Sequence, residues 1–149
     1  MKKTIFFLTL LAFNTSALFA QNNKNKKSKI ATVLQHKVVL HLTSNDTLAW
    51  KGLMNNIKNL KAGWGDSVQI EVVTNGMGIQ LLMKEKTTQQ QKITAFKRKG
   101  VVFYACENTM SEKNIAKDEM IPETEFVPMG IGEIIKKEEN GWSYIKAGF

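Results

Sequence analysis

From residue 37 onwards the chain alternates short segments of strand composition with longer segments of helical spacing. The five short segments occupy residues 38–42, 68–73, 101–105, 125–128 and 142–146. Strands that are apolar on both faces and separated by helices form parallel sheets whose two faces are covered. The sequence therefore predicts an α/β fold of three layers, α/β/α, with a mostly parallel sheet of about five strands. The strand order does not follow from this pattern.

Helices are expected in the intervals between these strands. The first begins after the capping residues at 43–46, and its apolar positions repeat at i, i+3, i+4 and i+7: Trp50, Leu53, Met54, Ile57 and Leu60. Residues 87–91 resemble a capping box that opens a second full helix. Shorter helical pieces are predicted at residues 79–83 and after Thr109, and a last helix at 131–135.

The first twenty residues have the pattern of a secretory signal peptide. Lys2 and Lys3 precede an apolar run at 5–13, and Ala20 offers a small residue at a cleavage point. The apolar run is shorter than the ~20 residues that a membrane-spanning helix needs. We therefore expect a signal peptide at 1–20, export to the periplasm, and no membrane association after cleavage.

An Asn/Lys-rich segment follows at residues 21–36, and we expect it to be a solvated linker to one domain at 37–149. The formal net charge of the whole chain is +8, but most of the basic excess lies in residues 1–29. No basic stripe interleaved with aromatic residues follows this segment. We therefore expect no nucleic-acid partner.

Cys106 is the only cysteine of the chain and stands where the third strand gives way to a turn. A lone cysteine cannot form an intramolecular disulfide, and a thiol at a strand end is expected to be reachable by solvent and by a partner molecule. The thiolate is the reactive form of the residue. Asn108 and Thr109 are expected to donate hydrogen bonds here, whereas the adjacent Glu107 should oppose ionisation. The alternative is that Cys106 is a small buried residue at the end of a strand.

Ligands of open parallel sheets bind beyond the carboxyl ends of the strands. The loops expected at that edge contain glycines, whose backbone N–H groups can approach a ligand, and they lead towards helix N-termini, which favour anions. The candidate ligand-binding residues from these loops are Asn75, Gly76, Asn108, Thr109 and Gly130, beside Cys106 as the candidate catalytic residue.

Metal and nucleotide sites are not indicated. His36 and His41, the two histidines, lack the spacing of a zinc site, so we expect structural or surface roles for both and no bound metal. Neither Gly-x-Gly pair extends to a dinucleotide fingerprint, and there is no Gly-Lys-Ser/Thr phosphate loop, so no cofactor is expected.

Several segments together resemble the DsrE/DsrF-like family of the sulfur-relay superfamily, in its small exported branch. The matching segments are residues 38–44, 72–79, 103–110, 127–135 and 139–146. The resemblance implies a flavodoxin-like α/β fold and a homo-oligomer, commonly a trimer or hexamer. It also implies a sulfur carrier in some members, with Cys106 at the matching position and a separate sulfur donor or acceptor protein. The tRNA-thiolation role of cytoplasmic members is not carried over, because this chain has an export signal.

The leading hypothesis is a periplasmic sulfur-handling protein in which Cys106 carries a persulfide. A non-catalytic oligomeric module that binds a small anion at the strand-end loops is the alternative, and an oligomeric scaffold without a ligand remains open. A single cysteine can carry sulfur or form a mixed disulfide, but it cannot serve as a self-contained dithiol oxidoreductase.

Overall fold

A computed structural model describes residues 36–148 as one five-stranded sheet with helices on both faces. The strands are β1 (His36–Leu42), β2 (Val68–Thr74), β3 (Val102–Cys106), β4 (Thr124–Val127) and β5 (Ser143–Ala147). Their order is β4-β3-β2-β1-β5, and every neighbouring pair is parallel. The predicted α/β fold with its parallel sheet is therefore confirmed. Because all strands run the same way, their carboxyl ends meet at one edge of the sheet.

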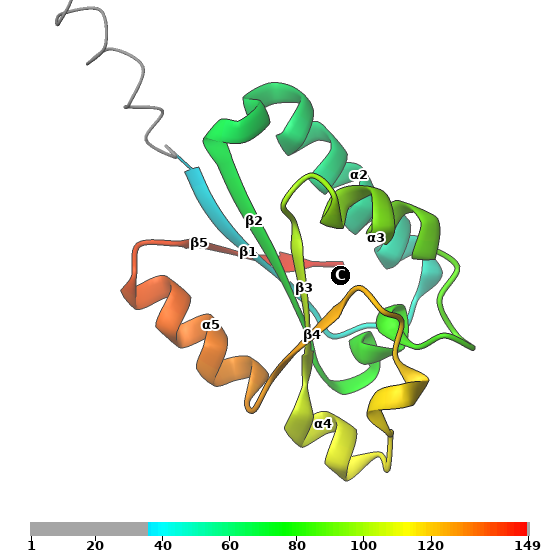
Figure 1. The fold of residues 1–149 in the computed structure, drawn as a ribbon. Coiled ribbons are helices and arrows are strands. Elements are labelled where there is room, and N and C mark those ends of the chain that lie inside the picture. Colours follow the sequence, from blue (N-terminus) through cyan, green and yellow to red (C-terminus); the bar gives the residue numbers. More distant parts are fainter. Residues whose placement is uncertain (1–35, 149) are drawn as a thin grey trace, which may run out of the picture. The chain divides into compact units, whose positions relative to one another are not determined.

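The two faces of the sheet are covered unequally (Figure 1). Helices α2 (Thr47–Trp64) and α3 (Gln90–Lys97) lie over one face, where they bury the larger apolar core with alternate strand residues. Helix α5 (Gly130–Glu139) lies over the other face and closes a smaller core, formed by Val39, Val73, Ile134 and Trp142. The short helix α4 (Glu107–Glu112) follows β3 directly.

Helix α2 begins where its sequence predicts. Asp46 is the N-cap, and its side chain accepts a hydrogen bond of 2.8 Å from the Leu48 N–H. At the other end the chain turns at Gly65, whose φ of 55° lies in the left-handed region that glycine adopts most easily. The short helical piece expected near residues 79–83 is a 3₁₀ helix, Gly76–Leu82.

Two predicted helix starts are wrong. Helix α3 begins at Gln90, three residues after Thr87, and its N-cap Gln89 makes no side-chain capping bond. The Thr87 hydroxyl accepts a hydrogen bond from the Gln89 N–H in the turn before the helix. Helix α4 begins at Glu107 rather than after Thr109, so Cys106 is its N-cap residue. The sequence pattern placed the cap at the threonine because threonine is a common capping residue, but here that residue lies inside the first turn.

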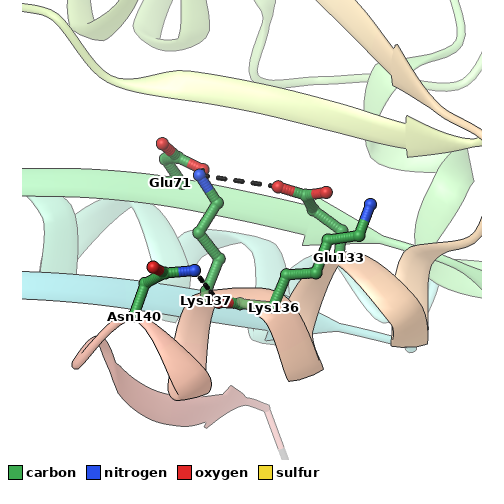
Figure 2. A network of polar contacts seen from close by, with 5 residues as sticks. All are labelled: Glu71, Glu133, Lys136, Lys137 and Asn140. Atoms are coloured by element: carbon green, nitrogen blue, oxygen red, sulfur yellow. Dashed lines mark hydrogen bonds and ion pairs between the residues drawn. The ribbon is translucent and has the colours of Figure 1, made fainter.

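Helix α5 is fixed to the sheet by a partly buried network of charges (Figure 2). Lys137 Nζ lies 2.6 Å from Glu71 Oε2, in the middle of β2, and 3.5 Å from Glu133 Oε1 one turn earlier. Burial lowers the pKa of Lys137, but the hydrogen bond and charge of Glu71 outweigh burial and leave it above its usual value. Lys137 Nζ also lies 4.6 Å from the centre of the Trp142 ring. The network therefore holds the C-terminal half of α5 against the middle of β2.

The expected signal peptide at 1–20 and linker at 21–36 fall outside the described residues, apart from His36, the first residue of β1. Within residues 36–148, no helix combines the length and the apolar composition needed to cross a bilayer.

Candidate functional site at the strand ends

Cys106 is the last residue of β3 and lies between β2 and β4 at the carboxyl edge of the sheet. Its residue surface is only 5% exposed, so the expectation of a freely reachable thiol is wrong. The cause is the first turn of α5, which comes to the sulfur from a distant part of the sequence. Asn108 in α4 and Met129 just before α5 are nevertheless both exposed, so the site lies close to the protein surface.

The sulfur of Cys106 is surrounded by hydrogen-bond donors. The Gly130 N–H, in the first turn of α5, donates to Cys106 Sγ at 3.2 Å. Burial raises the pKa of the Cys106 thiol, but the backbone N–H groups of Thr109, Gly130 and Asn108 and the side chain of Thr109 together lower it by more. The net pKa therefore lies below the usual value for cysteine. A helix N-terminus adds positive potential to the same side of the sulfur.

Thr109 connects Cys106 to the loop that follows β2. The Gly76 N–H donates to Thr109 Oγ1 at 3.1 Å, and the side chain of Thr109 lowers the pKa of the Cys106 thiol. Gly76 needs its flexibility at this point, because its φ is 54°. The Gly76 and Gly130 N–H groups were expected to face a ligand, but both bind atoms of the chain. The Gly130 N–H binds Cys106 Sγ, and the Gly76 N–H binds Thr109 Oγ1.

Gly130 is the point of closest approach between α5 and the strand ends. A Cβ atom at this position would lie 3.2 Å from Cys106 Cβ, 3.3 Å from Val73 Cγ1 and 3.5 Å from Asn75 Cβ. Only glycine therefore allows the N–H of this residue to come within hydrogen-bond distance of the sulfur without displacing a neighbour. Gly78 has a different role, since a Cβ there would overlap the backbone carbonyl of Leu42.

Glu107 does not act on the thiol as its position in the sequence implied. Its carboxylate lies 2.6 Å from Lys117 Nζ, so its negative charge is partly compensated. Lys117 also lies 4.6 Å from the centre of the Phe126 ring. Both charged side chains are partly exposed, so this ion pair contributes little to stability. Its effect is to reduce the repulsion that Glu107 would exert on a thiolate at Cys106.

His41 is the residue of this edge that the sequence did not indicate. It is 7% exposed, its Nε2 lies 2.9 Å from Asn75 Oδ1, and its Nδ1 lies 3.1 Å from the Tyr144 hydroxyl. The available signal was its position, next to last in an apolar strand that ends at the ligand-binding edge. His36, at the opposite end of β1, stacks on Trp64 with 3.8 Å between ring centres. Among residues 36–148, no group of three His, Cys, Asp or Glu residues is arranged to hold a metal ion.

The fold and this edge define a parallel α/β protein with one buried, donor-lined cysteine. The chain belongs to the DsrE/DsrF-like family, which it matches over residues 7–147, and thus to a family related to sulfur relay. It is 31% identical to MTH1491 of Methanobacterium thermoautotrophicum, a protein of unknown function, with a TM-score of 0.71 over 74% of this chain and 98% of that one.

A second solved structure shares the fold at lower identity. BT1422 of Bacteroides thetaiotaomicron, also of unknown function, is 20% identical with a TM-score of 0.58 over 74% of this chain and 93% of that one. No curated protein matches the chain.

Proposed function

We propose that this protein is a periplasmic sulfur-handling protein in which Cys106 carries sulfane sulfur as a persulfide. The observation that carries the proposal is the set of donors around Cys106 Sγ, which favours a thiolate in spite of burial. Membership of a family related to sulfur relay supports the same chemistry. A structural cysteine at a strand end would need no such donors.

The transfer is written with a polysulfide or a protein persulfide as the donor. The Cys106 thiolate attacks the terminal sulfane sulfur, a new Sγ–S bond forms and the S–S bond of the donor breaks. A protein persulfide leaves as a thiolate, and a polysulfide leaves as the anion shortened by one sulfur. A thiolate on an acceptor then attacks the outer sulfur and releases the Cys106 thiolate. Because the chain has no second cysteine, donor and acceptor are separate molecules.

Mass spectrometry of the purified protein after incubation with polysulfide tests this reaction. We expect a gain of one sulfur or more on the peptide that contains Cys106, its removal by a thiol, and no gain in Cys106→Ser. Thr109→Val, which removes one donor to the sulfur, should slow the gain without abolishing it. Absence of added sulfur on wild type, together with slow alkylation at neutral pH, would refute the carrier role.

The burial of Cys106 favours one alternative, a module that binds a small anion without covalent chemistry. Its donors would then serve the anion, and Cys106→Ser would still bind. A thermal-shift comparison of wild type and Cys106→Ser with sulfate, thiosulfate and phosphate separates the two functions. Equal stabilisation of both proteins favours the binding module, whereas sulfur loading that depends on the thiol favours the carrier.

Export and assembly are part of the same proposal. The pattern of residues 1–20 supports cleavage and periplasmic location, which N-terminal sequencing of the mature protein tests. A homo-oligomer, trimer or hexamer, is proposed from the family, and the exposed apolar side chains of Met129, Ile131 and Ile135 along the start of α5 support it. Light scattering of wild type and Ile135→Glu tests it, since a monomeric wild type would refute the assembly.

A further inference from the structure

The buried histidine of β1 lies at the centre of a polar chain that none of the steps above uses. Tyr144 from β5, His41 from β1 and Asn75 from the loop after β2 are joined by hydrogen bonds of 3.1 and 2.9 Å. The three residues are separated by 34 and 103 positions in sequence, so only the folded sheet brings them together. Tyr144 is 40% exposed and His41 is 7% exposed, so the chain runs from solvent into the protein.

The chemistry of these contacts fixes the orientation of the Asn75 amide. Asn75 Oδ1 is an acceptor only, so the ring proton of neutral His41 is on Nε2, and Nδ1 accepts from the Tyr144 hydroxyl. The amide oxygen is thereby bound to the histidine. The amide Nδ2, with two protons to donate, has no partner among residues 36–148. Asn75 is half-buried, and its Nδ2 is not among the buried unpaired atoms, so this donor is open to a ligand.

The oriented amide lies beside the thiol. Asn75 Cβ and Cys106 Cβ flank the same backbone position, 3.5 and 3.2 Å from where a Cβ of Gly130 would be. An unpaired amide donor beside the thiol favours a negatively charged group close to Cys106.

We propose that His41 is a positioning residue that holds the Asn75 amide so that Nδ2 donates to the anionic end of the sulfur donor. This inference rests on the proposed carrier function, and it adds the substrate class: a small anionic compound of sulfur, such as a polysulfide or thiosulfate, rather than a neutral disulfide. Tyr144 supports the arrangement by donating to the other ring nitrogen of His41.

Alkylation of Cys106 by a matched pair of reagents tests this role. Iodoacetate is an anion and iodoacetamide is its neutral counterpart of nearly the same size, so the ratio of their rate constants reports recognition of charge and cancels changes in exposure or pKa. We expect the ratio to fall about tenfold in Asn75→Ala and His41→Leu, the size expected for one hydrogen bond to a charged group. His41→Gln, whose amide can donate to Asn75 Oδ1, should retain much of the wild-type ratio.

The control variant is His36→Leu, which removes the other histidine of the same strand at the opposite edge. It should leave the ratio unchanged. If His41→Leu alters both rate constants equally, or if His36→Leu lowers the ratio as much, the histidine is only structural and the proposal is overturned. Should His41→Leu fail to fold, Tyr144→Phe gives the same comparison with a smaller change, and it should also lower the ratio.

If the Cys106 thiol reacts with neither reagent, a titration with thiosulfate followed by NMR tests the positioning role of His41. Thiosulfate should shift the side-chain amide signals of Asn75 in wild type and in Cys106→Ser, and the shift should vanish in His41→Leu. An Asn75 signal that ignores thiosulfate in wild type would overturn the positioning role. This titration does not depend on sulfur loading. If the protein gains no sulfur from polysulfide but shows the His41-dependent shift, the carrier function is refuted and the positioning role of His41 is supported.

Discussion

Replacing Gly130 by alanine tests how closely helix α5 must approach the thiol. The added methyl group would meet Cys106 Cβ at 3.2 Å, Val73 Cγ1 at 3.3 Å and Asn75 Cβ at 3.5 Å. None of the three atoms is the far end of a flexible side chain, so α5 itself must move outwards. Overpacking of this kind costs about 1–3 kcal/mol, against which alanine in a helix gains up to about 1 kcal/mol over glycine. We therefore expect a net loss of up to about 3 kcal/mol in the free energy of unfolding.

The same helix offers a matched control, Gly132→Ala. The methyl group added there would approach Met129 Cε to 2.5 Å, but this atom is the end of a flexible, exposed side chain that can turn away. The gain in helix propensity is similar at both positions. Gly132→Ala should therefore be neutral or slightly stabilising, and unfolding in urea should place the two variants about 1–3 kcal/mol apart.

The thiol gives a second measurement on the same pair of variants. Outward movement of α5 lengthens the bond from the Gly130 N–H to Cys106 Sγ, now 3.2 Å. A hydrogen bond to a charged group contributes about 1.5–3 kcal/mol, so its partial loss should raise the thiol pKa by about one unit. The pH dependence of alkylation by iodoacetamide measures this pKa. If Gly130→Ala is as stable as Gly132→Ala and has the wild-type thiol pKa, the argument for close approach is refuted.

Three further outcomes are expected. Thr109→Val should raise the pKa of Cys106 by removing the hydroxyl donor, and a pH profile of alkylation that is unchanged would count against that bond. Lys137→Ala leaves Glu71 buried without its cation and should cost about 3–5 kcal/mol, whereas a loss below 1 kcal/mol would show that water reaches the site. Asp46→Ala should lower the free energy of unfolding by about 1 kcal/mol through loss of the α2 cap, and a stability equal to wild type would contradict the cap.

The lowered pKa of Cys106 also makes stability depend on pH. The folded thiol loses its proton at a lower pH than the unfolded one, whose pKa is near the ordinary 9.0. The contribution to stability is therefore complete above pH 9.0 and is lost as pH falls through the folded pKa. Wild type, but not Cys106→Ser, should gain stability as pH rises towards that value. If the free energy of unfolding, measured in urea, changes with pH equally in wild type and in Cys106→Ser, the lowered pKa of the thiol is contradicted.

The sheet and its helices could be predicted from sequence because each element depends on its own residues. The apolar run of β1, the Asp46 cap and the spacing of α2 are all local patterns. The exposure of Cys106 could not be predicted, because its cover comes from Gly130, 24 positions further on. The contacts of His41 could not be predicted for the same reason, since both of its partners are distant in sequence and only the strand order β2-β1-β5 brings them to it.

The burial of Cys106 and its lowered pKa have opposite physical causes, and their combination is what argues for function. Burial alone raises the pKa of a thiol and leaves it inert. Here the N–H of Gly130 and the polar groups of Thr109 and Asn108 reverse that effect. Gly130 has no side chain to obstruct this contact, and Gly76 has the positive φ of its turn. A cysteine that only fills space needs neither feature, and this combination is what supports the proposed role of the thiolate.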